Sequence, residues 1–263
     1  MANDSIKKTL VVTVVLCLVC SVLVSGAAVV LRDRQQDNAH LDMQRNILSI
    51  SGLVDDASTL DRSQIDTQFS RITARLVDLS EGKYSSALNP DSYDQRAAAT
   101  NPSLSRSLPS QRDQASIRRQ AKVAKVYEVR EGQTLQTLIL PVHGYGLWST
   151  LYGYLALSGD LNTVVGFGFY EHAETPGLGG EVDNPVWRAT WQGKKLFDDQ
   201  GQLQITVLKG HVDPTSAQAP YQVDGLSGAS MTTRGVNNLV RFWLAEDGFG
   251  PFLANLKQGS AQP

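Results

Sequence analysis

The sequence is poor in cysteine, and its net charge is close to zero. Only Cys17 and Cys20 occur among the 263 residues, and both lie in an apolar run near the N-terminus. The remainder of the chain therefore offers no pair of thiols for a disulfide. The formal net charge is −2, which argues against nucleic acid as a partner, because phosphate backbones select strongly basic surfaces.

Clusters of metal ligands are also missing from the sequence. The four histidines are scattered, with no His-x-x-x-His or mixed Cys/His spacing. Cys17 and Cys20 have a Cys-x-x-Cys spacing, but two thiols in an apolar helix without further ligands are typical of packing residues. No complete dinucleotide-binding fingerprint follows a strand pattern either. We expect neither a metal site nor direct binding of NADH.

One long uncharged run is present, from Thr9 to Leu31. Its 23 residues span roughly 35 Å as a helix, which suffices for a bilayer core of about 30 Å. A cleaved signal peptide is the alternative, since Lys7 and Lys8 precede the run, but the run exceeds the usual signal core. We predict a retained transmembrane helix over 9–31 after a short tail, 1–8. The flanking charges nearly balance and leave its orientation open.

Beyond the apolar run, the chain divides by composition. Residues 32–58 are mostly polar and predict a helical stalk, and a globular domain is expected over 59–263. Asp61 and Gln64 have capping-box spacing. The apolar stripe Ile65, Phe69, Ile72 and Leu76 predicts a helix there. Residues 85–120 are rich in Ser and poor in large apolar side chains, which indicates a polar surface insertion without chemistry of its own.

The middle of the domain shows strand patterns. Runs rich in Val, Ile, Leu, Tyr and Phe recur at 123–130, 135–142, 150–157, 163–170 and 203–208. The connections among the first four are mostly too short for crossover helices, so a mainly antiparallel sheet is expected. Asn184 and Pro185 are typical of a helix start and predict a short helix through Trp187 and Trp191. The predicted fold class is α+β, preceded by one N-terminal transmembrane helix.

The segment 224–232, Asp-Gly-Leu-Ser-Gly-Ala-Ser-Met-Thr, places small hydroxyl-rich residues directly ahead of a strongly periodic helix. The helix is expected from about Thr232 to Gly248, because Val236, Leu239, Val240, Trp243 and Leu244 share one face. Free N–H groups and the positive end of the helix dipole meet at such a helix start, and Gly228 and Ala229 permit close approach. The segment suits a phosphate. An ordinary capped helix start is the alternative interpretation.

The segment resembles the flavinylation motif, Asp-x-x-(Ser/Thr)-Gly-Ala-(Ser/Thr)-x-Thr, whose last Thr carries FMN through a phosphoester. A second segment, 172–179, resembles the other signature of the same domain. With the N-terminal helix, the two segments make the chain similar to the family of C subunits of the Na+-translocating NADH:quinone oxidoreductases. The G subunit of the Rnf complex, with ferredoxin as redox partner, is the near paralogue and stays an alternative, as does a membrane-anchored anion-binding module without redox chemistry.

The resemblance implies a set of site residues. It assigns covalent FMN to Thr232, because the family spacing counts two residues from Ser230 and so excludes the neighbouring Thr233 as the acceptor. Around this bond the resemblance and the residue types predict cofactor contacts from Ser227, Gly228, Ala229, Ser230, Met231, Thr233, Glu174, Thr175, Gly177, Leu178, Leu147, Trp148 and Lys209. Leu178 is expected against the flavin ring, and Lys209 near its phosphate. The threonine hydroxyl must be activated by another group, and within the motif Asp224 is the only candidate base.

The resemblance also implies partners and a place in the cell. A separate flavin transferase would supply the activation of the threonine and deliver FMN from FAD. The other membrane and flavin subunits of the complex would exchange electrons with this one, while the complex exports Na+. The domain is expected on the periplasmic side of the bacterial inner membrane, with the N-terminus in the cytoplasm.

Overall fold

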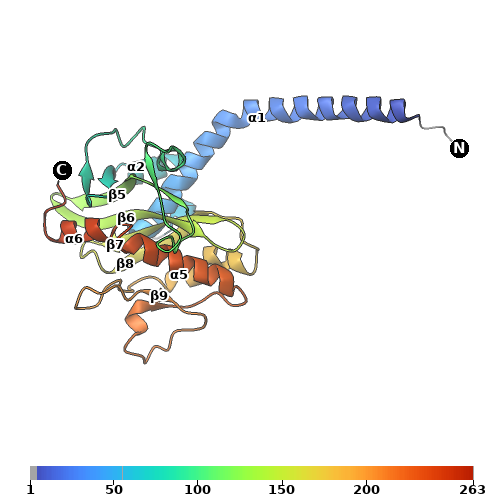
Figure 1. The fold of residues 1–263 in the computed structure, drawn as a ribbon. Helices are drawn as coiled ribbons and strands as arrows, with labels where there is room; N and C mark the ends of the chain where they lie inside the picture. Colours follow the sequence, from blue (N-terminus) through green and yellow to red (C-terminus); the bar gives the residue numbers. More distant parts are fainter. Residues whose placement is uncertain (1–4, 55, 263) are drawn as a thin grey trace. The chain divides into compact units, whose positions relative to one another are not determined.

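The structure is a computed structural model that describes residues 5–54 and 56–262. The first four residues of the predicted tail lie outside the described residues. The chain divides into two compact units, residues 1–43 and 44–263. One continuous helix, α1 (Ile6–Ser51), supplies most of the first unit and the first residues of the second (Figure 1).

The N-terminal part of α1, through Leu31, is mostly apolar and exposed. It contains an uncharged stretch, and α1 is the one helix in the described part of the chain long and apolar enough to cross a bilayer. Two hydroxyls of this stretch are paired within the helix: Thr13 Oγ1 donates to the Thr9 carbonyl at 2.9 Å, and Ser21 Oγ donates to the Cys17 carbonyl at 2.7 Å. Such internal pairing removes the cost of placing these hydroxyls in lipid.

The second unit is built on a six-stranded, entirely antiparallel sheet in the order β2-β1-β5-β6-β7-β8. The strands are β1 (Ile72–Asp78), β2 (Lys83–Ser85), β5 (Val123–Glu131), β6 (Thr134–Tyr145), β7 (Thr150–Ser158) and β8 (Val164–Glu171). Two short pairs lie outside the sheet: β3 (Ser105–Ser107) with β4 (Arg119–Ala121), and β9 (Thr206–Val207) in parallel with β10 (Gln222–Val223). The α+β class with a mainly antiparallel sheet is confirmed.

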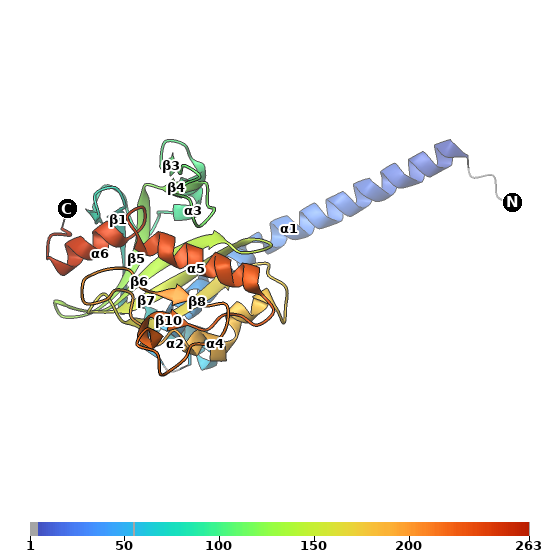
Figure 2. The ribbon, with the colours of Figure 1, turned by 60° about the horizontal axis from the view of Figure 1, so that its bottom comes forward.

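The two faces of the sheet are covered by different helices. On one face lies α5 (Ser230–Leu244), which crosses the sheet in Figure 2 and is followed by α6 (Gly250–Lys257). The apolar stripe of α5 joins alternate residues of β6 and β7 in the main core. On the other face, the end of α1 contacts Gly166 and its Ser51 carbonyl accepts from Thr137 Oγ1 at 3.1 Å.

The predicted helix over 61–76 is correct at its start and wrong at its end. Asp61 and Gln64 form the expected capping box of α2 (Arg62–Phe69). The chain then turns, so Ile72 and Leu76 lie in β1, where they pair with Val129 and Lys125 of β5. A short apolar pattern fits helix and strand alike, and pairing with a distant strand decided the outcome.

The other predicted strands and helices form near their expected positions. Four of the five predicted strands coincide with β5 to β8, whereas the run 203–208 contributes only the two residues of β9. The helix expected after Asn184 forms as α4 (Pro185–Ala189), with Asn184 accepting from the Val186 N–H, but it ends before the buried Trp191. Three single turns of 3-10 helix complete the elements: η1 (Ala57–Thr59), η2 (Gly179–Asp183) and η3 (Ala219–Tyr221).

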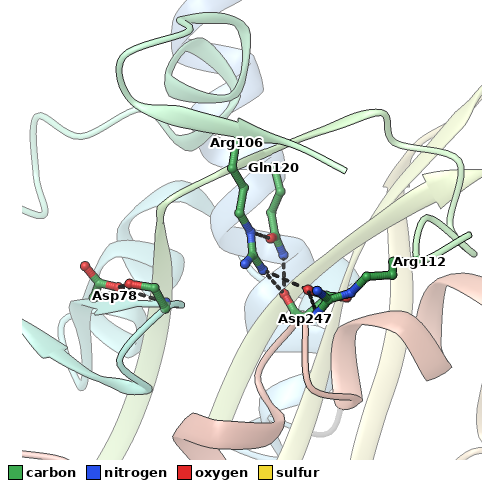
Figure 3. A network of polar contacts seen from close by, with 6 residues as sticks. Asp78, Arg106, Arg112, Gln120 and Asp247 are labelled. Atoms are coloured by element: carbon green, nitrogen blue, oxygen red, sulfur yellow. Dashed lines mark hydrogen bonds and ion pairs between the residues drawn. The ribbon is translucent and has the colours of Figure 1, made fainter. Parts of the chain in front are cut away.

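The polar insertion 85–120 is folded onto the domain. It contains α3 (Gln95–Thr100) and the β3–β4 pair. Asp247, between α5 and α6, fastens it: Arg112 pairs with the Asp247 carboxylate through two bonds of 2.7 and 2.8 Å, and Arg106 and Gln120 donate to its carbonyl (Figure 3). Bidentate, charge-assisted bonds of this kind fix geometry strongly. Together with the sheet, the insertion lines a half-open pocket of about 1180 Å³ that is rich in tyrosine.

Candidate functional site

The site lies where the chain enters α5. Gly228 has a left-handed backbone, with φ of 72°, which turns the loop into the helix. The N-cap residue is Ala229, whose side chain is unable to accept a hydrogen bond from the first turn. A helix of 15 residues therefore begins without a side-chain cap, and its N–H groups and dipole favour an anion at this point.

The two adjacent threonines in the first turn of α5 have different partners. Thr232 is 1% exposed and Thr233 is 2% exposed. The Thr232 hydroxyl donates to Glu174 Oε2 at 2.6 Å, whereas Thr233 Oγ1 accepts the backbone N–H of Leu226 at 3.0 Å. Neighbouring helical positions point about 100° apart, so Thr233 holds the loop in place while Thr232 faces a carboxylate.

Glu174 is itself held by the β6–β7 turn. Its Oε1 accepts the backbone N–H groups of Leu147 and Trp148, both at 3.0 Å, and its side chain is 5% exposed. Burial raises the pKa of the Glu174 carboxyl. The hydrogen bonds from Thr232, Trp148 and Leu147 outweigh burial, so the pKa lies below its ordinary value. Glu174 is therefore ionised at neutral pH.

Two glycines allow this close assembly. A Cβ at Gly179 would lie 2.5 Å from Thr232 Oγ1 and 2.6 Å from Glu174 Oε2, and a Cβ at Gly146 would lie 2.5 Å from Glu174 Oε1. Any side chain at either position would push the hydroxyl and the carboxylate apart. The positions that these Cβ atoms would fill border Thr232 Oγ1 and the Glu174 carboxylate directly.

Apolar side chains surround this polar centre on the surface. Leu147, Trp148, Leu178 and Met231 are all more than a third exposed, with Trp148 at 65%. They are tied to the centre: Leu147 and Trp148 donate to Glu174, Met231 precedes Thr232, and the Leu178 side chain lies 3.2 Å from the place of a Cβ at Gly228. A polar anchor for an anion bordered by exposed apolar surface fits a phosphorylated planar molecule such as FMN.

The other predicted site residues lie around this centre. Ser227, Gly228 and Ser230 are exposed at the helix start, and Ala229 is buried. Gly177, with φ of 73°, shapes the turn in which the Thr175 carbonyl accepts from the N–H groups of Leu178 and Gly180. Lys209 is exposed, with its backbone packed against Gly225 at the beginning of the motif.

The carboxylate of Asp224, the one candidate base within the motif, is engaged away from Thr232. Its carboxylate accepts the Val212 N–H at 2.7 Å and contacts His211 Nδ1 at 3.3 Å, and its carbonyl accepts from Trp187 Nε1. Asp224 thus ties the 209–213 loop to the motif. Glu174 takes the position beside Thr232 instead. Its contact with Thr232 was not predicted, although each residue lies in one of the two segments that carry the resemblance.

Comparison with known proteins bears on this site. Residues 146–245 match the FMN-binding domain family. The C subunit of the Na+-translocating NADH-quinone reductase of Pseudomonas aeruginosa is 56% identical over 263 residues, covering 99% of this chain and 100% of that protein. The chain belongs to this C-subunit family. The Yersinia pestis member of the C-subunit family is 47% identical over 98% of this chain and 96% of its own length.

Solved structures of the C-subunit family share the fold. The crystal structure of Shewanella oneidensis NqrC has a TM-score of 0.74 and 36% identity, covering 82% of this chain and 96% of that one. The Parabacteroides distasonis member has a TM-score of 0.63 and 27% identity, covering 85% of this chain and 96% of that one. The family expected from the two motifs is therefore confirmed, and the FMN-binding match contains Leu147, Glu174, Leu178 and Thr232.

Proposed function

We propose that this protein carries FMN bound covalently through its phosphate to Thr232 Oγ1, and that it relays electrons within a Na+-translocating NADH-quinone reductase. The observation that carries the proposal is the Thr232 hydroxyl at the uncapped start of α5, within the segment that matches the FMN-binding domain. Bound FMN would supply one- and two-electron redox chemistry at the rim of the domain.

The residues of the site have separate tasks in this proposal. The first-turn N–H groups of α5 stabilise the phosphate, because they carry the positive end of the helix dipole. Leu178 and Met231 present apolar surface to the flavin ring, and Trp148 extends this surface to the β6–β7 turn. Removing water from one face of the ring changes the relative stability of its redox states, so this contact tunes the potential.

Partners and location extend the proposal. The exposed apolar stretch of α1 anchors the chain in the inner membrane, with the domain in the periplasm, beside the other membrane and flavin subunits of the complex. A flavin transferase attaches the cofactor.

An alkaline phosphatase fused after Gln258 should be active if the domain is periplasmic. An inactive phosphatase together with a fluorescent cytoplasmic reporter at the same site would reverse the topology.

The attachment site is tested by two adjacent substitutions in the full chain, co-expressed with a flavin transferase. Thr232→Val should lose the fluorescent protein band after denaturation, whereas Thr233→Val should keep it in the folded fraction. Mass spectrometry of the unmodified sequence should place the FMN phosphate on Thr232. FMN found on Thr233, or no flavin in a fully folded chain, would reject the proposal, and the latter result would favour an anion-binding module.

A further inference from the structure

The acceptor hydroxyl already shares a hydrogen bond with a carboxylate. Thr232 Oγ1 donates to Glu174 Oε2 at 2.6 Å, a short distance typical of a hydroxyl bonded to an ionised acceptor. A threonine hydroxyl is a poor nucleophile at neutral pH unless a neighbouring base removes its proton. Geometry therefore supplies the first requirement of general base catalysis, since the base lies within hydrogen-bond reach of the proton.

Among the described residues, every hydrogen-bond donor to the Glu174 carboxylate is a neutral group. Leu147 and Trp148 contribute backbone N–H groups to Oε1, which leaves Oε2 directed at the threonine. The negative charge is consequently fixed in direction but is not cancelled by a cation. A carboxylate in this state is oriented to accept a proton, and its two N–H donors keep it in place as it does so.

We propose that Glu174 is the general base that activates Thr232 for attachment of the flavin. This inference rests on the proposed function, because it assumes that Thr232 is the acceptor. It assigns Glu174 to the maturation of the protein, a role separate from contact with the finished cofactor.

The reaction balances with FAD as the flavin donor, bound by the transferase. A bond forms between Thr232 Oγ1 and the phosphorus on the riboflavin side of FAD. The bond from that phosphorus to the bridging pyrophosphate oxygen breaks, and AMP leaves with the electron pair. The threonine proton passes to Glu174 Oε2 and then to water, and no atom changes its oxidation state.

A structural role for Glu174 predicts something different. If its only task were to hold the β6–β7 turn, its loss would lower stability or the final amount of attached flavin, without a selective effect on rate. General base catalysis contributes about 10²- to 10⁴-fold to a rate. The rate of attachment is therefore the quantity that separates the two roles.

The experiment uses the full chain, produced without transferase and kept in detergent, with excess flavin transferase and FAD. Attached flavin is followed over time by in-gel fluorescence and intact mass. Glu174→Gln should attach FMN at least about 100-fold more slowly yet approach the same final amount, with its thermal unfolding nearly unchanged. Glu171→Gln is the matched control, because Glu171 lies three residues earlier and pairs with Arg96; it should react at the wild-type rate.

Further measurements keep the proposal falsifiable. The rate for Glu174→Gln should rise with pH as hydroxide replaces the missing base, whereas the unmodified chain should show less dependence over the same range. Glu174→Asp, which keeps the carboxylate but withdraws it by one methylene, should have an intermediate rate and provides the test if the glutamine variant does not fold. An unchanged rate in Glu174→Gln, or a lower final amount at an unchanged rate, would overturn the role of Glu174. Flavin retained in Thr232→Val would instead overturn the proposed function.

Discussion

Glu128 and Glu174 are both buried glutamates, yet their surroundings have opposite character. Glu128 has a side chain that is 0% exposed and accepts from the Tyr84 hydroxyl and from Arg130 Nε at 2.7 Å, with Arg75 Nε at 3.5 Å. Glu174 receives two backbone N–H groups and one threonine hydroxyl. Cations compensate the negative charge of Glu128, whereas the donors to Glu174 are neutral dipoles that orient its carboxylate.

The comparison shows how one residue type serves two purposes in one domain. A buried carboxylate that is paired with cations links strands β1, β2 and β5, because its partners come from all three. Removing either side of such a pair leaves a buried charge without compensation, which is costly. A carboxylate held by neutral donors has no cation beside it and stays oriented toward the hydroxyl that it faces. The cation-paired arrangement of Glu128 suits a structural role, and the arrangement of Glu174 suits a general base.

The largest expected effect comes from removing the paired carboxylate. Glu128→Ala should lower the free energy of unfolding by about 3 kcal/mol, because the Tyr84 hydroxyl and two arginines lose their common acceptor. For a domain of this size, the midpoint of thermal unfolding of the full chain should fall by roughly 6–12 °C. Attachment of flavin to the folded fraction should continue at the normal rate. A midpoint within about 1 °C of the unmodified protein, far below the shift expected for such a loss, would contradict the structural role of Glu128.

The next effect comes from pushing Glu174 and Thr232 apart. In Gly179→Ala, the new methyl group would lie 2.5 Å from Thr232 Oγ1, so the pair must separate, at a cost of about 2 kcal/mol from overpacking. Flavin attachment, measured by in-gel fluorescence, should slow as well. Gly210→Ala is the control, since a Cβ there meets no atom within 4 Å. Equal behaviour of the two variants would mean that the close approach at Gly179 is unimportant.

A smaller effect is expected from removing the Tyr84 hydroxyl, which bonds to Glu128. Tyr84→Phe should destabilise the domain by about 1–2 kcal/mol, because Glu128 loses a donor. Burial, together with the hydrogen bond to Glu128, raises the pKa of Tyr84 above its ordinary value. The folded protein thus holds this proton more tightly than the unfolded chain, so its contribution is complete below about pH 10 and is lost as the pH rises further. Thermal unfolding between about pH 8 and pH 11 should show less alkaline loss in Tyr84→Phe than in the unmodified protein.

The smallest effect on stability is expected from neutralising Glu174. Glu174→Gln keeps the size of the side chain and should change stability by less than about 1 kcal/mol near pH 7. Because the folded pKa of Glu174 is lowered, the contribution of its charge is present above the ordinary glutamate pKa and disappears as the pH falls through the folded value. The difference in unfolding midpoint between the two proteins should therefore shrink below about pH 4. A difference that grows in acid would show that the sign of this pKa shift is wrong.

Much of the fold was predictable because its signals are local. Each of β5 to β8 carries its own apolar pattern, and the start of α2 carries its own capping box. The prediction was wrong at Ile72 and Leu76, where the spacing is compatible with both helix and strand. Pairing of β1 with β5, about fifty residues later in the chain, settled the matter. No local pattern contains this information, since it depends on which strand is available as a neighbour.

The packing of the insertion 85–120 onto the domain is likewise not predictable from local sequence patterns. Its polar composition indicated a surface segment, and most of its side chains are indeed exposed or half-exposed. Its attachment depends on Arg106 and Arg112 reaching Asp247, which lies more than 130 residues away. Ion pairs between remote segments leave no periodic signal, so composition describes the surface of such a segment but does not predict what it contacts.

By itself, the sequence determined the long apolar N-terminal helix, the amphipathic α5 and the small-residue segment that leads into it, because each depends on spacing within one stretch of chain. Only the tertiary structure decided what the Thr232 hydroxyl faces. Glu174 is 58 positions away, and it reaches Thr232 because the sheet brings the segment after β8 and the β6–β7 turn to the start of α5 and because Gly146 and Gly179 leave room. The direction of a side chain depends on register and close approach, and both arise only when distant segments pack together.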